Sequence, residues 1–262
     1  MSRHNNHNHH KIIDSVCTYC GVGCDIAAVV ENGEIKKVYA KEDGKVSRGK
    51  LCIKGKEGWR YLYSPLRIKE ARVKKSFFEA NKGLFVTKKP TISTADSGYY
   101  VLGYDEVYDA VAAKLQEIKQ KYGPESIAGI GGARTSCEGS YSFQRFIRQT
   151  LGSPNIDNCA RVCHSPSLAG LRRTVGEGAA TNPFDDILGA EFLLVIGSNT
   201  TEAHPIVANR VLDALSKGAT LAVMDVREIQ LSKKANFQLT IPYEANLLVL
   251  NMMAYVILKE KL

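Results

Sequence analysis

The sequence lacks the segments that carry a protein into or across a membrane. No run of apolar residues reaches the roughly 18 positions that a membrane-spanning helix needs. The start of the chain has neither an apolar signal region nor a twin-arginine pair. We therefore predict a cytoplasmic protein without a direct membrane span. Residues 1–11, which are polar and rich in Asn and His, should form a disordered tail.

Two further features that the sequence lacks narrow the classes of ligand that the protein is expected to bind. There is no complete G-x-G-x-x-G motif, so no single motif predicts a dinucleotide site. The segment from Glu34 to Lys89 holds 17 Lys and Arg against 6 Asp and Glu, but it lacks the interleaved aromatic residues of single-strand nucleic-acid binders. We predict no nucleic-acid partner. The basic segment is either an ordinary solvated face or a surface for an anionic cofactor or an acidic partner.

Cysteine, by contrast, is plentiful, with seven residues in the chain. Four of them follow the pattern C-x2-C-x3-C-x27-C, at Cys17, Cys20, Cys24 and Cys52. A triplet plus one remote thiolate is typical of a [4Fe–4S] cluster, whereas structural zinc usually takes two separated pairs. We predict the cluster, with zinc and uncomplexed thiols as alternatives. In a chain without an export signal, metal ligation is expected rather than disulfides.

The N-terminal part has the pattern of a small β-rich module over residues 12–66. Two strands, Ile26–Val30 and Ile35–Tyr39, flank Asn32-Gly33, which is a strong hairpin turn signal. The following basic and polar stretch, with Pro90 and residues 91–98, predicts a surface connection. Apolar residues then recur at helical spacing from Asp105 to Tyr122, and Gly123 ends that helix.

The rest of the chain alternates between strand and helix patterns. Strands are predicted at residues 126–130, 192–197, 220–225 and 237–241, and helices at residues 140–151, 205–217 and 244–259. Such alternation predicts an α/β fold with a parallel sheet and helices on both faces. We divide this part into residues 67–157 and residues 158–262. Cys137 matches no motif and is expected to be a buried free thiol.

A second group of reactive side chains lies in the sequence from Asn158 to Pro166. Cys163 and His164 are adjacent, and a thiolate beside an imidazole can ligate a metal, attack a substrate or move protons. Cys159, four residues earlier, allows a two-thiol site. Most Cys-His pairs are structural, so this stretch alone leaves its role undetermined.

The two groups together resemble the molybdenum/tungsten bis-pterin oxidoreductases, and most closely the catalytic subunit of formate dehydrogenase. The resemblance is carried by Cys17–Cys24, Gly49–Gly55, Asn158–Gly170 and His204–Asn209, in that order. It runs from about residue 14 to the end. Family members continue well beyond Leu262, so the resemblance implies a β-rich [4Fe–4S] module followed by incomplete Rossmann-like α/β domains.

The resemblance also implies roles for individual residues. The four N-terminal cysteines would hold the cluster, and Cys163 would ligate molybdenum or tungsten. His164 would be the adjacent proton acceptor in formate oxidation. Lys54 would lie between cluster and pterin, where its charge eases electron passage, although an ordinary basic face is the alternative. Arg161 would belong to the cofactor-binding residues.

A dinucleotide site is predicted where two strands end. The strand at residues 192–197 runs into a turn of small residues before a helix, where phosphates commonly bind. The next strand ends in Asp225, which suits a ribose hydroxyl or a guanine edge. By resemblance these turns grip a guanine dinucleotide arm of the pterin, through Gly197, Ser198, Asn199, Thr201, Asp225 and Arg227. His204 is either a pocket residue or a structural histidine.

The expected partners are formate and CO2, the rest of the catalytic subunit, and an iron–sulfur electron-transfer subunit. We expect no formate turnover from the 262-residue chain alone. One alternative is another enzyme of the family, such as a nitrate reductase. The other is a non-catalytic iron–sulfur electron-transfer module.

Overall fold

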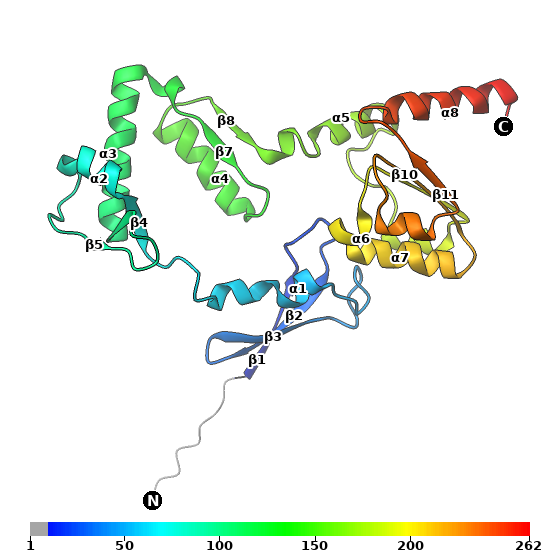
Figure 1. Cartoon of the computed structure of the whole chain (residues 1–262), viewed down its shortest axis with the longest axis horizontal. Helices are drawn as coiled ribbons and strands as arrows, with labels where there is room; N and C mark the ends of the chain where they lie inside the picture. The colour runs from blue at the N-terminus through cyan, green and yellow to red at the C-terminus, as the bar shows by residue number, and fades with distance from the viewer. Residues whose placement is uncertain (1–9) are drawn as a thin grey trace, which may run out of the picture. The chain divides into compact units, whose positions relative to one another are not determined.

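The computed structural model describes residues 10–262, which form two compact units (Figure 1). The first unit combines the N-terminal part, up to Leu62, with Ala180–Leu262, and the second comprises Tyr63–Ala179. Most of the predicted disordered tail lies outside the described residues, while residues 10 and 11 begin the first strand. Among residues 10–262, no helix is both long enough and apolar enough to cross a membrane.

The first unit begins with an antiparallel sheet of three strands, β1 (His10–Val16), β2 (Asp25–Glu31) and β3 (Glu34–Ala40). The predicted hairpin is confirmed, and Asn32 and Gly33 both adopt positive φ angles, of 51° and 81°. These angles suit a two-residue turn that follows the twist of the flanking strands. The short helices α1 (Ile53–Glu57) and η1 (Gly58–Tyr63) follow the sheet.

The later part of the first unit is a parallel sheet in the order β11-β10-β9. Its strands are β9 (Phe192–Ile196), β10 (Thr220–Asp225) and β11 (Phe237–Thr240), as the alternating pattern predicts. Helix α7 (Pro205–Ser216) packs Val211 and Leu215 against Leu221 and Val223 of β10. The predicted α/β class is confirmed here. The remaining helices are η6 (Phe184–Gly189), α6 (Thr200–Ala203), η7 (Gln230–Lys234) and α8 (Asn246–Glu260).

Helix α7 also belongs to the core of the N-terminal part. Ile206, in its first turn, is buried with Cys17, Val22 and Cys24. Phe184 and Val207 pack against the same cluster. Two segments of the chain that are more than 100 residues apart therefore share one core, and the cysteine-rich loops are covered from the side of the α/β sheet.

The second unit starts with a small antiparallel sheet in the order β4-β6-β5. It comprises β4 (Ala71–Lys74), β5 (Thr91–Ile92) and β6 (Tyr99–Leu102), with α2 (Lys75–Ala80) and η2 (Lys82–Leu84) between the first two. The predicted surface connection over residues 90–98 is therefore wrong in part, because β5 pairs with β6. Helix α3 (Tyr104–Tyr122) follows as predicted, and Val107 and Ala110 pack in the core of this sheet.

The rest of the second unit surrounds a pair of parallel strands, β7 (Gly129–Gly131) and β8 (Ile156–Asn158). The predicted strand at residues 126–130 is displaced, since η3 (Pro124–Ser126) occupies its start. Helix α4 (Cys137–Arg145) continues into a π-helical turn, η4 (Phe146–Thr150), and η5 (Cys159–Arg161) and α5 (Ser165–Thr174) end the unit. Cys137 is exposed, so its predicted burial is wrong.

Candidate functional site

The four N-terminal cysteines lie on two loops of the first unit. Cys17 follows β1, and its N–H donates to the carbonyl of Cys24 at 2.9 Å, which closes the Cys17–Cys24 loop. Gly23, with φ +66°, makes the turn between Cys20 and Cys24. Cys52 precedes α1, and its backbone carbonyl accepts a hydrogen bond from the N–H of Lys56. Cys17 and Cys24 are buried, and Cys20 and Cys52 are half-buried.

The environment of Cys24 shows that the four thiols lie near one another. The pKa of Cys24 is raised to about 11, mainly by burial and then by the neighbouring Cys17, Cys20 and Cys52, in that order. A thiol in this position gives up its proton only when a cation takes its place. Among the described residues, no three Cys, His, Asp or Glu side chains gather around the position of a single metal ion.

The loops around the thiols fit a bulky soft-metal group. Cys17, Cys20 and Cys24 belong to a cluster of apolar side chains, which we call the cysteine pocket. Together with Cys52 they supply the four sulfur donors that an iron–sulfur cluster needs. Gly55 is buried beside Cys17, where an added Cβ would lie 3.2 Å from its Sγ and 2.5 Å from Cδ1 of Leu51. A glycine is therefore needed at that position if the thiol of Cys17 is to stay where it is.

Lys54 connects this pocket with the predicted dinucleotide turn. Its Nζ donates to the carbonyl of Glu202, in α6. Both residues belong to the first unit. The ammonium group of Lys54 therefore lies beside the segment that leads from β9 into α7.

The predicted dinucleotide residues come together at one edge of the parallel sheet. β9 and β10 are neighbours, with Ile196 opposite Met224, so the turns after both strands lie at their shared carboxyl edge. Ligands of open α/β sheets usually bind there. Gly197, with φ +54°, starts the first turn, and its N–H donates to the carbonyl of Met224 at 2.9 Å.

Local hydrogen bonds hold the side chains of these turns. Thr201 Oγ1 donates to Oδ1 of Asn199 at 3.1 Å, and the hydroxyls of Ser198 and Thr200 are 3.0 Å apart. Asp225 is buried, and its carboxylate accepts a 3.3 Å hydrogen bond from the N–H of Arg227. The structure thus brings every residue of the predicted set into the same region of the first unit.

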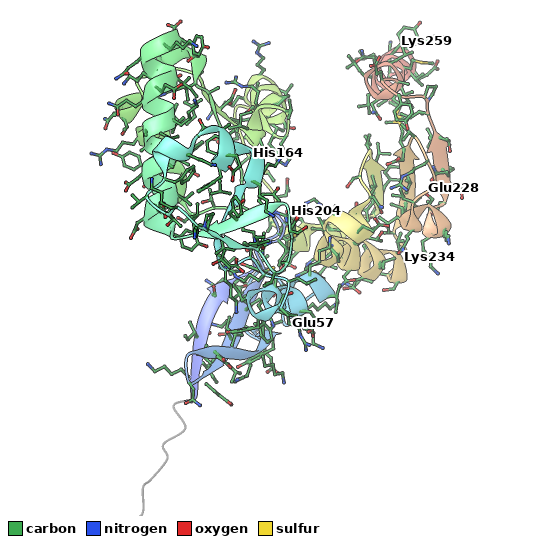
Figure 2. All side chains as sticks on the ribbon, turned by 60° about the vertical axis from the view of Figure 1, so that its left-hand side comes forward. Glu57, His164, His204, Glu228, Lys234 and Lys259 are labelled. Carbon is green, nitrogen blue, oxygen red and sulfur yellow. The ribbon has the colours of Figure 1, made fainter. Side chains whose placement is uncertain are left out.

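His204 lies at the junction between α6 and α7 (Figure 2). Its carbonyl accepts hydrogen bonds from the N–H groups of Val207 and Ala208, so its backbone starts α7. Its side chain is half-buried. The position suits a pocket residue beside the dinucleotide turn, and the structural role remains an alternative prediction.

The predicted metal-ligand loop belongs to the second unit. Cys163 and His164 are both exposed and follow η5, with their N–H groups bonded to the carbonyls of Cys159 and Ala160. Pro166 lies in the first turn of α5, immediately after them. The thiol of Cys163 and the imidazole of His164 are therefore both exposed, on consecutive residues directly before α5.

Two hydrogen bonds of the Asn158 side chain and one ion pair fix the start of this loop. Oδ1 of Asn158 accepts from the N–H of Ala160 at 2.9 Å, and its amide donates to the carbonyl of Gly132 at 3.1 Å. Arg161 Nε donates to Asp157 at 2.8 Å. Arg161 is thus engaged with the loop itself, while its guanidinium remains largely exposed.

A cavity of about 600 Å³ lies beside this loop and was not predicted from the sequence. It opens at the carboxyl ends of β7 and β8, where Gly131 and Asn158 stand opposite each other. An added Cβ on Gly131 would lie 3.2 Å from the amide nitrogen of Asn158. In the sequence, only the Gly131-Gly132 pair directly after a strand pointed to this cavity. On its own such a pair indicates a turn, and only its position beside β8 shows that it borders a cavity.

Two family models match the chain. The molybdopterin oxidoreductase Fe4S4 domain matches residues 10–64, and the molybdopterin oxidoreductase model matches residues 87–262. Formate dehydrogenase H of Escherichia coli K12 is 37% identical over 253 residues, which cover 96% of this chain and 33% of that protein. The F420-dependent formate dehydrogenase subunit alpha of Methanocaldococcus jannaschii is 33% identical over 252 residues, with 96% and 34% covered.

A solved structure has a similar fold. Acetylene hydratase from Pelobacter acetylenicus matches with a TM-score of 0.68 and 24% identity, over 95% of this chain and 32% of that one. The chain thus spans about a third of the length of the curated relatives it matches.

Proposed function

Because the chain belongs to the molybdopterin oxidoreductase family, we propose that it is the N-terminal part of a formate dehydrogenase catalytic subunit, which oxidises formate to CO2. Membership confirms the predicted family, and the two family domains imply the predicted [4Fe–4S] cluster and molybdopterin cofactor.

The observation that carries the proposal is that Cys163 and His164 are consecutive, exposed residues directly before α5. When bound, the metal–pterin centre supplies a two-electron acceptor and the cluster a one-electron relay. The thiolate of Cys163 ligates the metal, since a soft sulfur donor suits a metal that changes oxidation state. The imidazole of His164 accepts the proton released from formate, because histidine is the side chain best suited to moving protons in catalysis.

Residues of the first unit hold the other groups in this proposal. The four N-terminal cysteines bind the cluster, and Lys54 stands between it and the pterin. The dinucleotide arm binds at the turns after β9 and β10, where Asp225 accepts hydrogen bonds from the guanine or its ribose. The remainder of the catalytic subunit, an iron–sulfur electron-transfer subunit and a cytoplasmic location complete the proposal.

Metal analysis together with formate-dependent dye reduction tests the proposal. The holoenzyme that contains this chain should hold iron with molybdenum or tungsten and should reduce a dye with formate. Iron without either metal would identify a non-catalytic iron–sulfur module. Both metals with nitrate reduction but no formate oxidation would identify another enzyme of the family. Zinc in place of iron would overturn the cluster assignment.

A further inference from the structure

The loop from Lys41 to Lys50 is fastened to the cysteine pocket through Val46. The side chain of Val46 packs against the core that contains Cys17 and Cys24. Its N–H donates to the carboxylate of Asp25 at 3.2 Å, and Asp25 directly follows Cys24 in the chain. The loop is close-fitting here, since an added Cβ on Gly44 would lie 3.0 Å from the carboxylate of Asp25. The position of Val46 is thus tied to that of a cluster cysteine.

The carbonyl of Val46 is held from the opposite side by Arg210 of α7. Nη2 of Arg210 donates to this carbonyl at 2.9 Å, and its Nε lies 3.3 Å from Asp185 in η6. Asp185 also pairs with Arg48 of the same loop. Only 3% of Arg210 is exposed, so one buried cation connects the loop, α7 and η6.

Packing alone does not explain a buried arginine at this position. Ile206, one turn earlier on α7, already fills the apolar contact with the cysteine core. Burying a guanidinium costs several kcal/mol unless its hydrogen bonds are made, on the order of the cost of any buried ion. Its rigid fork can reach a carbonyl and a carboxylate at once, which the single ammonium of lysine does less well. The contacts of Arg210 therefore fix one particular position of the loop on α7, which an apolar contact would not do.

The same helix carries the predicted dinucleotide turn at its start. α7 begins directly after His204, and the turn of residues 197–201 is joined to it through the short helix α6. Any shift of the Lys41–Lys50 loop on α7 would therefore move the cluster cysteines relative to that turn. A polar anchor with two partners is the contact that resists such a shift.

We propose that Arg210 is a positioning residue, which holds the Lys41–Lys50 loop on α7 and so fixes the cluster pocket against the dinucleotide turn. The inference rests on the family's iron–sulfur cluster and not on formate as the substrate. If the enzyme acts on a substrate other than formate, the inference about Arg210 still holds. If the chain binds no iron, the wild-type protein will already reveal it, before any variant is compared.

The test is the rate at which the cluster-loaded chain loses iron to a ferrous chelator under anaerobic conditions. Arg210→Met keeps the bulk of the side chain but removes both hydrogen bonds. Iron loss should then be about tenfold faster or more, since residues that hold the surroundings of a metal site in place change metal affinity by roughly 10–100-fold. Arg210→Lys, which can keep one of the two bonds, should fall between Arg210→Met and the wild type. The spectrum of the reduced cluster in electron paramagnetic resonance should broaden in the same order.

A matched control lies one turn further along the same helix. Asp213 pairs with Lys50 of the same loop at 3.0 Å, but both side chains are about half exposed. Asp213→Asn should therefore leave the rate of iron loss within about twofold of the wild type, because exposed ion pairs contribute little. The proposal is overturned if folded Arg210→Met retains iron like the wild type, or if Asp213→Asn loses it equally fast. If Arg210→Met does not fold, an unchanged rate in Arg210→Lys overturns it.

Discussion

Replacing Gly58 by alanine should displace the ring of Tyr19 from the cluster module. Gly58 lies at the end of α1, and an added Cβ there would stand 2.2 Å from Cε2 and 2.4 Å from both Cζ and Oη of Tyr19. These distances are far inside van der Waals contact. The tyrosine ring is rigid, and its hydroxyl donates to the carbonyl of Gly58 at 3.0 Å, so the ring must swing out as a whole.

The expected loss of stability follows from three contributions. The lost hydrogen bond is worth about 0.5–1.5 kcal/mol. Overpacking a filled site costs about 1–3 kcal/mol. Alanine in a helical backbone gains about 1 kcal/mol over glycine, and Gly58 has helical angles, with φ −61° and ψ −26°. We therefore expect Gly58→Ala to lower the free energy of unfolding by about 2 kcal/mol, from the sum of these contributions.

The chain contains a single tryptophan, Trp59, which makes the assay local. Its Nε1 donates to the carbonyl of Lys56 at 2.9 Å, so its fluorescence reports this turn. Anaerobic urea titrations of the cluster-loaded chain should give the predicted decrease. Gly189→Ala, at the end of η6 in the same unit, is the matched control, because nothing lies within 4 Å of its added Cβ. It should change stability by less than about 0.5 kcal/mol.

A double-mutant cycle isolates the clash from other effects of the substitution. In a Tyr19→Ala background the ring is gone, so Gly58→Ala should be neutral or stabilising by up to about 1 kcal/mol. If Gly58→Ala destabilises the two backgrounds equally, or the wild type by less than about 0.5 kcal/mol, the argument from the Tyr19 contact is refuted.

Three other predictions concern the second unit. Cys163→Ser should remove formate oxidation and the bound molybdenum or tungsten in the holoenzyme, whereas Cys137→Ser, another exposed thiol, should leave both within about twofold, as expected for surface positions. His164→Ala should lower kcat by about 10²–10⁴-fold while metal content, measured by mass spectrometry, stays normal; unchanged kcat would contradict its proton role. Hydrogen bonds from the N–H and hydroxyl of Thr87, both 2.7 Å, lower the pKa of Glu106, so its stabilisation is present above its ordinary pKa and is lost as pH falls through the lowered value. Urea midpoints of the wild type and Glu106→Gln should therefore differ at neutral pH and converge in acid; a constant difference would contradict this.

Local signals in the sequence predicted much of the fold. Asn32-Gly33 identifies a hairpin because few other residue pairs accept two positive φ angles in succession. Helix α3 is long and regularly patterned, so its bounds are predicted almost to the residue. The strands β9 and β10 are recognisable because both are continuous apolar runs that end in a turn.

Short strands and contacts between distant segments could not be predicted from local signals in the sequence. β5 has two residues and lies in a polar stretch, so pairing with β6, and not its composition, makes it a strand. Cys137 was predicted to be buried because free thiols usually are, but it lies at the exposed start of α4. The contact of Arg210 with Val46 leaves no trace in either segment, since each reads as an ordinary helix or loop.

The shared core of the first unit has a consequence for the order of events during synthesis. All four cluster cysteines are made within the first 52 residues. Their pocket, however, is lined by Phe184, Ile206 and Val207, and these residues leave the ribosome much later. A domain folds as a unit once its parts are available. The nascent N-terminal segment therefore presents four thiols without their apolar cover, and the pocket closes only after α7 has been made. A cluster bound by these cysteines would therefore find its complete apolar surroundings only after α7 has been made.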